Sequence, residues 1–377
     1  MALVLNEEQA MLKESVKDFL NMKSPISALR ELRDTNNPDG FDRSVWAEMA
    51  ELGLTGLNIS EEFGGLDFGY IALGQALEET GRTLAASPLV STVLLSTTAI
   101  NLCGSDTQKA TLLPELAEGN LIMSFAHEEK THHNPTHVAT TATLDGDFYT
   151  INGSKTFVLD GHVADKFVVV ARVSGAVNDK EGIQLFLVDS NREGIKVNRT
   201  MMMDNRNAAK VNFSNTSIPK ENKMNLSCFE DLEKIYAIGA IGLAAEMLGS
   251  AQECFEKTIA YLKERQQFGV AIGSFQALQH RAAKMFIDIE LSKSVVIKAL
   301  KAIDTNENNL TEIASLAKAK LGQTLKLVSN EGIQMHGGVG MTDDVEIGFF
   351  IKRARVAQQT LGDYNYHLDR YAKLRGY

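Results

Sequence analysis

The chain has 377 residues, of which 44% are hydrophobic, 23% are charged and 6 are proline. This length suits two or three domains, and the composition is that of a well-packed, helix-rich globular protein, which excludes a disordered chain. The formal net charge of -10 argues against nucleic acid as the main partner, because a phosphate backbone requires a basic face.

The cysteine pattern and the apolar segments bear on location. The three cysteines are far apart and show no metal or disulfide spacing, so we expect a cytoplasmic protein. The first residues lack the basic start and apolar core of a signal peptide. The segment 235–252 carries one charge, Glu246, among many Gly and Ala residues, which predicts a buried helix rather than a membrane span.

Residues 1–119 predict a helical domain. Asn6 is expected to cap a first helix, because Gln9 follows at the spacing of a capping box. A second helix is expected over 41–52, starting at Asp42 or Ser44. After a glycine-rich loop over 53–69, further helices are expected over 70–81, over 88–103 and from 106 to near 119.

Residues 120–223 predict a middle β domain, a barrel or a sandwich. The segment 138–173 alternates apolar and polar residues and is rich in Thr, Val and Phe. Two glycine-containing sequences within it, Asp145-Gly146-Asp147 and Asn152-Gly153, predict turns. Further strands are expected over 182–189, 194–203 and 210–213.

Residues 224–377 predict a C-terminal four-helix bundle. The helical period returns over 229–265, 275–304, 310–335 and 344–371, with short links between these segments. The fold class is therefore mainly α with a central β domain, in the order helical domain, β domain, helical bundle.

Several motifs occur at characteristic places in this order. They are Ser60-Glu61-Glu62-Phe63-Gly64-Gly65, the stretch 104–119, Ile151-Asn152-Gly153-Ser154-Lys155, Arg265-Gln266-Gln267-Phe268-Gly269 followed by Ile272-Gly273-Ser274-Phe275-Gln276, and Gln334-Met335-His336-Gly337-Gly338-Val339-Gly340. Together with the element order they make nearly the whole chain resemble the acyl-CoA dehydrogenase family, and the last two motifs are the most specific. The resemblance implies a FAD-dependent enzyme that desaturates an acyl-CoA thioester in lipid metabolism, as in fatty acid β-oxidation.

The last two motifs contain the candidate FAD contacts. The planar fork of Arg265 can bind phosphate oxygens at two points, although an Arg at a helix end is also a common surface residue. Gly337 and Gly338 allow a ligand to approach the backbone closely, or they simply end a helix. The remaining candidates are the amides of Gln276 and Gln334 and the ring of Phe268, for which the alternatives are polar surface and core packing.

In the family that the chain resembles, two subunits share each FAD site. The Arg and Phe come from one subunit and the Gln-Gly-Gly turn comes from its neighbour. The resemblance therefore implies self-association to a dimer or tetramer, or alternatively a hetero-oligomer, with an electron-transfer flavoprotein as the electron acceptor.

The catalytic base is the main departure from the family pattern. The family places a Glu in a Y-E-G-T segment, where this chain has Leu361. Some relatives place the Glu on the first helix of the C-terminal bundle, where this chain has Gly239, so neither position carries a carboxylate. Glu246 and Asp363 are the remaining candidates. Glu246 lies two turns after Gly239, about 10 Å along the axis, and its alternative role is a structural ion pair with a residue such as Arg281. Asp363 can instead cap a helix.

The β domain also departs from the family pattern. Residues 125–129 replace the usual T-E-P segment, and Phe157 and Leu159 stand in the usual W-I-T/S segment against the flavin ring. Phe157 keeps an aromatic face for the flavin, whereas Leu159 loses a hydroxyl. We expect no metal site, because Pro135 interrupts any helix that would align His132, His133 and His137, and we interpret these as loop histidines.

Three hypotheses follow for the function. The first is an active FAD-dependent acyl-CoA dehydrogenase. The second is a non-catalytic or half-site subunit of a heteromeric enzyme. The chain resembles divergent bacterial family members that act on steroid or dicarboxylic acyl-CoAs, such as the small subunit of a pimeloyl-CoA type enzyme, and some of these members work as hetero-oligomers. The third is a flavin oxidase of the same fold.

Overall fold

The computed structural model describes residues 5–377, which form two compact units. Of these residues, one unit, here called the bundle unit, comprises 5–31, Tyr70–Ala86 and Ala240–Tyr377; the other, the sheet unit, comprises Leu32–Gly69 and Ser87–Gly239. The predicted N-terminal helices are thus divided between the two units, and the border at Gly239 falls within a long helix.

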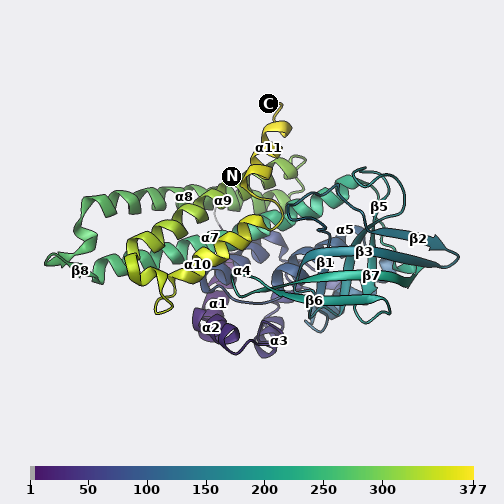
Figure 1. Cartoon of the computed structure of the whole chain (residues 1–377), viewed down its shortest axis with the longest axis horizontal. Helices are drawn as coiled ribbons and strands as arrows, with labels where there is room; N and C mark the ends of the chain where they lie inside the picture. Colours follow the sequence, from purple (N-terminus) through teal and green to yellow (C-terminus); the bar gives the residue numbers. More distant parts are fainter. Residues whose placement is uncertain (1–4) are drawn as a thin grey trace. The chain divides into compact units, whose positions relative to one another are not determined.

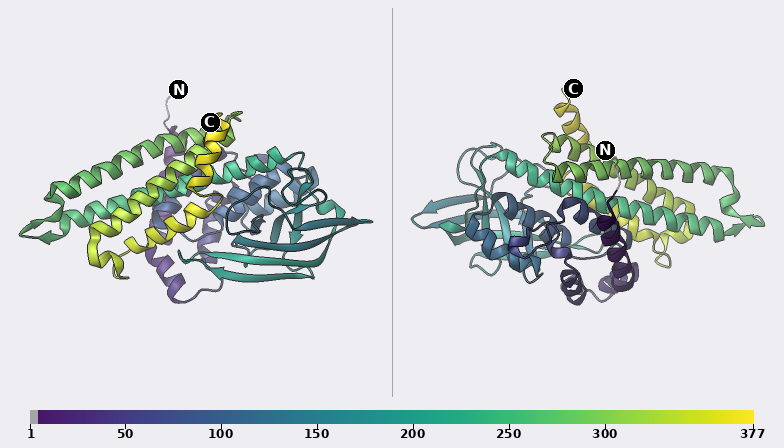
Figure 2. Two further views of the ribbon diagram at one scale, coloured as in Figure 1. Left: turned by 45° about the horizontal axis from the view of Figure 1, so that its top comes forward. Right: turned by 180° about the vertical axis from the view of Figure 1, so that it is seen from behind.

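Long helices dominate the bundle unit (Figure 1). Its elements are α1 (Glu7–Lys23), most of α2 (Ile26–Asp34), α4 (Gly69–Thr83), most of α7 (Phe229–Glu264), α8 (Gln276–Asp304), α9 (Leu310–His336), α10 (Ile347–Gln359) and α11 (Tyr364–Leu374). Helix α9 packs against α8, α10 and α11. Figure 2 shows the long helices running side by side from two further directions.

Local sequence signals explain where several of these helices begin. Asn6 and Gln9 form the expected capping box at the start of α1. The expected helix 344–371 is wrong as a single element, because the chain breaks between α10 and α11 at Thr360–Asp363. Leu361 there has a φ of +58°, which no helix allows.

Close packing of α4 on α7 depends on two glycines. A Cβ atom at Gly81 would lie 1.9 Å from the carbonyl oxygen of Glu246, and one at Gly249 would lie 1.7 Å from that of Glu78. The absence of side chains lets the two backbones touch. Helix α7 has the length and hydropathy of a membrane span, but its most apolar window is entirely buried in the protein, as in a core helix.

The sheet unit contains a curled seven-stranded sheet (Figure 1). Its strands are β1 (Met123–Ala126), β2 (Thr141–Asp145), β3 (Phe148–Leu159), β4 (Lys166–Arg172), β5 (Ile183–Asp189), β6 (Ile195–Met201) and β7 (Asn207–Pro219). Their order is β1-β4-β2-β3-β7-β6, with β5 paired to β4. Strands β1 and β2 run parallel to β4, and the other pairs are antiparallel.

The two predicted turns in this sheet have different outcomes. Asp145 pairs with Phe148, so Gly146 and Asp147 form the expected hairpin turn. The predicted turn at Asn152-Gly153 is wrong, because both residues lie inside β3 at an irregularity of its pairing with β7. A Cβ atom at Gly153 would lie 2.4 Å from Thr140 Oγ1, so the glycine serves close strand packing there.

Shorter helical segments complete the sheet unit. They are α3 (Arg43–Glu51), α5 (Thr97–Cys103), α6 (Asp106–Ala117), the π-helical η3 (Leu89–Ser96) and the 3-10 turns η1 (Leu54–Gly56), η2 (Glu61–Phe63) and η4 (Lys220–Asn222). Asp42, one of the two residues expected to begin this helix, caps α3. The core of the sheet is built from inward-facing residues such as Ile151, Phe167, Phe186 and Val211.

Candidate functional site

The motif that begins at Arg265 forms a small hairpin at the end of α7. Strands β8 (Gln266–Gln267) and β9 (Val270–Ala271) pair across Phe268 and Gly269, whose φ angles are +54° and +79° (Figure 1). Two positive φ values define a tight hairpin turn that holds the Phe268 ring outward, 91% exposed. An aromatic ring fixed in solvent is typical of a surface that a ligand or another subunit covers.

Arg265 lies at the base of this hairpin with an exposed side chain. Its carbonyl oxygen accepts from the Ile272 N–H at 2.8 Å, which closes the hairpin. Within residues 5–377 its guanidinium forms no hydrogen bond or ion pair, so all its donors are available to a ligand. Gln276, the first residue of α8, is exposed as well.

The second motif ends α9 in a turn that is open to space. Gly337 has a φ of +66°, and its N–H donates to the carbonyl oxygens of Gln334 and Ile333. A Cβ atom at Gly337 or Gly338 would meet no atom within 4 Å, so the turn presents uncovered backbone. The side chain of Gln334 is exposed beside it.

One contact brings the two motifs to the same end of the bundle unit. The ring of Tyr261 on α7 stacks on His336 at a centroid distance of 4.3 Å, and its hydroxyl donates to the His336 carbonyl oxygen at 3.3 Å. Arg265 follows one helical turn later, its N–H donating to the Tyr261 carbonyl oxygen at 2.9 Å.

These features fit a cofactor that carries a pyrophosphate. An unpaired guanidinium supplies bidentate phosphate recognition, and an open glycine turn allows close approach of a ligand to backbone N–H groups. The exposed ring of Phe268 and the two exposed amides add stacking and hydrogen-bonding capacity around them. The residues present are therefore suited to hold FAD.

The carboxylate of Glu246 is engaged in a buried ion pair. Arg353 of α10 donates to both of its oxygens, each at 2.9 Å, and the two side chains are only 1% and 7% exposed. Arg281, the partner considered from the sequence, pairs with Glu331 instead. The arrangement is the bidentate fork expected of Arg with a carboxylate, and it secures α7 to α10.

The other candidate base, Asp363, lies at the break between α10 and α11. Its Oδ1 atom accepts the Tyr366 N–H at 2.8 Å and so caps α11, and no other hydrogen bond reaches its carboxylate from the described residues. Leu361, two residues earlier, is half-buried, and its carbonyl oxygen accepts from Nε2 of His367 at 2.9 Å.

The buried Lys318 holds the loop between α10 and α11 in place by hydrogen bonds. Nζ of Lys318 on α9 donates to the carbonyl oxygens of Gln358, at 3.2 Å, and Gly362, at 2.8 Å. Burial lowers the pKa of Lys318 to about 7, and the nearby charge of Asp363 opposes that lowering. The loop conformation around Leu361 thus depends on contacts with Lys318, which lies 40 and 44 positions from its two partners in sequence.

In the sheet unit, Phe157 lies in an irregular part of β3. Its φ is +53°, and the pairing with β7 shifts register between Lys155 and Val158. Such a bulge turns a side chain away from the regular alternation of a strand, and Phe157 is only half-buried. Leu159 accepts a hydrogen bond at its carbonyl oxygen from Ser124 Oγ at 2.8 Å.

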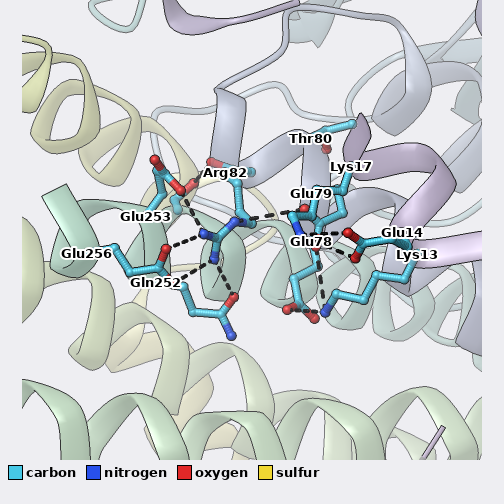
Figure 3. A network of polar contacts seen from close by, with 12 residues as sticks. Lys13, Glu14, Lys17, Glu78, Glu79, Thr80, Arg82, Gln252, Glu253 and Glu256 are labelled. Atoms are coloured by element: carbon cyan, nitrogen blue, oxygen red, sulfur yellow. Dashed lines mark hydrogen bonds and ion pairs between the residues drawn. The ribbon is translucent and has the colours of Figure 1, made fainter. Parts of the chain in front are cut away.

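A polar pocket that the sequence did not indicate lies in the bundle unit. It has a volume of about 660 Å³ and is lined by residues of α1, α4, α7 and α8. Figure 3 shows its charges: Lys13 pairs with Glu78 at 2.6 Å, and Arg82 pairs with Glu253 at 2.8 Å and Glu256 at 2.5 Å. Burial raises the pKa of Glu79 in the same network to about 7, with a contribution from the charge of Glu78.

Comparisons with known proteins identify the family. Models of the acyl-CoA dehydrogenase N-terminal, middle and C-terminal domains match residues 6–120, 125–216 and 231–374. The chain is 30% identical over 374 residues to the mitochondrial short/branched chain specific acyl-CoA dehydrogenase of Bos taurus, covering 97% of this chain and 85% of that protein.

Solved structures agree with this family. Butyryl-CoA dehydrogenase from Megasphaera elsdenii superposes with a TM-score of 0.92 at 25% identity, with both chains fully covered. A chain in a structure described as the electron transferring flavoprotein of Acidaminococcus fermentans gives a TM-score of 0.93 at 28% identity, again with full coverage. The chain belongs to the acyl-CoA dehydrogenase family. It is accordingly a FAD-dependent oxidoreductase with the helical, β and helical architecture of that family.

Two residues with a part in these sites were not singled out from the sequence. Arg353 and Lys318 lie on the buried faces of α10 and α9, and each is almost wholly buried. A single basic residue on an otherwise apolar helical face is the one sequence signal that indicates such a buried cation. The sequence does not show which residue of another element it contacts.

Proposed function

We propose that this enzyme desaturates an acyl-CoA thioester between its α and β carbons. In the proposed reaction a protein base removes the α proton, and FAD, when bound, accepts the hydride from the β carbon. Two observations carry the proposal: among residues 5–377 the exposed guanidinium of Arg265 has no partner, and the open Gly337-Gly338 turn lies at the same end of the bundle unit.

The proposed FAD contacts differ in the kind of interaction that each residue supplies. Arg265 binds the pyrophosphate, and the backbone at Gly337 and Gly338 accepts close approach of the cofactor. Gln276 and Gln334 offer amide hydrogen bonds, and the rings of Phe268 and Phe157 offer apolar faces. The exposure of Phe268 supports self-association, in which a second copy of the chain contributes to the site.

Of the two candidate bases, we favour Asp363. The geometry of Glu246 is that of a structural carboxylate, because both its oxygens are bound by Arg353. Asp363 uses one oxygen to cap α11 and keeps lone pairs for a proton, on the loop where the family carries its base.

Substituting Asp363 by Asn tests this assignment sharply. Asn caps a helix about as well as Asp, so the variant retains α11 while losing the basic carboxylate. Exchange of the α proton of an acyl-CoA for deuterium, followed by NMR, should slow by about 100-fold or more. Full exchange in Asp363→Asn would remove Asp363 as the base, and loss of exchange in a folded, flavin-loaded Glu246→Gln variant would transfer the role to Glu246.

A second candidate function is a half-site subunit that supplies no base. Leu361 in the base loop and the ion pair of Glu246 favour it. In that case Leu361→Glu should give turnover to an isolated chain that had none, and a second dehydrogenase chain with an intact Glu should co-purify with the wild type. Unaided turnover by the isolated wild type would contradict this candidate.

The proposed electron acceptor is an electron-transfer flavoprotein in the cytoplasm. Similarity to a chain in the Acidaminococcus fermentans structure described as an electron transferring flavoprotein supports this proposal. The test is the oxygen sensitivity of the reduced protein. Slow reoxidation by air and fast reoxidation by an electron-transfer flavoprotein are expected, whereas fast reoxidation by air would indicate an oxidase.

A further inference from the structure

Two histidines and a glutamate meet in the loop that follows β1 in the sheet unit. Nδ1 of His127 lies 3.6 Å from Oε1 of Glu128, and Nδ1 of His133 closely contacts the same oxygen. The ligand atoms of His127, Glu128 and His133 all lie within 4.8 Å of one another. They are close enough to be drawn around one ion with small side-chain adjustments, since metal–ligand bonds are about 2.0–2.2 Å.

The imidazole of His127 is buried beside Glu128 without a hydrogen bond from the part of the chain that the structure describes. It is only 4% exposed, and neither ring nitrogen makes a hydrogen bond to any of the described residues. A buried polar group without a partner costs about 1–3 kcal/mol, and a bound ion is one species that can satisfy such a group.

The surroundings hold the three side chains in place. The ring of Tyr236 packs against both imidazoles, with centroid distances of 4.9 Å to His127 and 5.5 Å to His133. The Glu128 carbonyl oxygen accepts the Thr156 N–H of β3 at 2.7 Å. The loop is thus fixed at both its backbone and its side chains, as a preorganised ligand set requires.

The charges around His127, Glu128 and His133 are compatible with a bound cation. Nζ of the fully buried Lys155 lies 2.7 Å from Glu129 and also donates to the His127 carbonyl oxygen at 3.1 Å. Glu129 balances this lysine and accepts the N–H groups of Ala139 and Thr140 as well. The charge of Glu128 therefore remains to compensate a bound ion.

We propose that His127, Glu128 and His133 bind a divalent transition-metal ion of the zinc type. Two imidazole nitrogens and one carboxylate oxygen are a ligand set that zinc favours, and three protein ligands leave a further position for water. The bound ion would connect the end of β1 to the loop carrying His133, and so stabilise the sheet unit. The proposal differs from the expectation of no metal site, which concerned His132, His133 and His137 and did not include His127.

The test uses the full-length, untagged, chelator-treated protein and zinc ions alone. Calorimetric titration should show one zinc per chain, and zinc should raise the unfolding temperature. His127→Ala should weaken binding by at least about 100-fold, given that loss of even an outer-shell partner typically costs 10- to 100-fold. His132→Ala is the matched control, because His132 is an exposed histidine of the same loop and should bind zinc as the wild type does.

Glu128→Gln provides a second variant in case His127→Ala does not fold. It retains the size of the side chain and a hydrogen-bond acceptor, yet should also bind zinc far more weakly. Absence of zinc binding by the wild type would overturn the proposal. Equal binding by wild type, His127→Ala and Glu128→Gln would likewise overturn it, since the ion would then be adventitious. None of these measurements depends on FAD or on turnover.

Discussion

The ion pair of Glu246 with Arg353 gives the most quantitative prediction. Glu246→Gln would leave a guanidinium, 7% exposed, without its counter-charge in the centre of the bundle unit. One of the two 2.9 Å hydrogen bonds to the carboxylate is lost and the other is weakened, where each is worth about 1.5–3 kcal/mol. This agrees with the roughly 3–5 kcal/mol by which breaking one side of a buried pair destabilises a protein. We therefore expect the free energy of unfolding to fall by about 3–5 kcal/mol.

Urea denaturation measures this change, and two further variants control it. The double variant Glu246→Gln/Arg353→Met should recover much of the loss, because it leaves no uncompensated charge. Glu331→Gln breaks the partly exposed pair with Arg281 and should cost no more than about 1 kcal/mol. A Glu246→Gln variant within about 0.5 kcal/mol of the wild type would refute the structural role of Glu246 and return it to the candidates for the base.

Four further predictions follow from single residues. Arg265→Lys keeps the charge but loses the bidentate fork, so flavin fluorescence should show FAD binding weakened by about tenfold, with unchanged unfolding. Gly338→Val meets no atom of its own chain and should fold normally but bind FAD poorly by the same assay. Lys318 has a pKa lowered from 10.5 to about 7, so wild-type stability should rise relative to Lys318→Met as pH increases between these values, in urea titrations. Glu79 has a pKa raised from 4.5 to about 7, so wild-type stability should fall relative to Glu79→Gln as pH rises through that interval; a flat difference would contradict the assigned burial.

Elements with strong local signals could be predicted from the sequence. The capping box of Asn6 and Gln9 and the long apolar period of α7 are encoded within a few helical turns, and the structure confirms both. The break between α10 and α11 was missed because it depends on distant contacts. Lys318 and His367 hold the carbonyl oxygens around Leu361 in a conformation that no local pattern shows.

The sites divide in the same way. Arg265 and the Gly337-Gly338 turn could be found because each motif is continuous in sequence, and the structure places both at one end of the bundle unit. The partner of Glu246 could not be predicted, because choosing Arg353 over Arg281 requires the register between two helices. The meeting of His127 with His133 likewise depends on how the loop segment 127–133 folds back on itself.

The central claim is that this chain holds FAD and oxidises an acyl-CoA. The most direct test is a visible spectrum of the purified protein, taken without oxygen before and after adding short, branched, dicarboxylic and ring-bearing acyl-CoAs in turn. We predict a yellow protein whose flavin absorption is bleached by one class of acyl-CoA, which would establish cofactor, activity and substrate class together. A flavin-loaded protein that none of them bleaches, or a chain that binds no flavin, would contradict the claim for this chain acting alone.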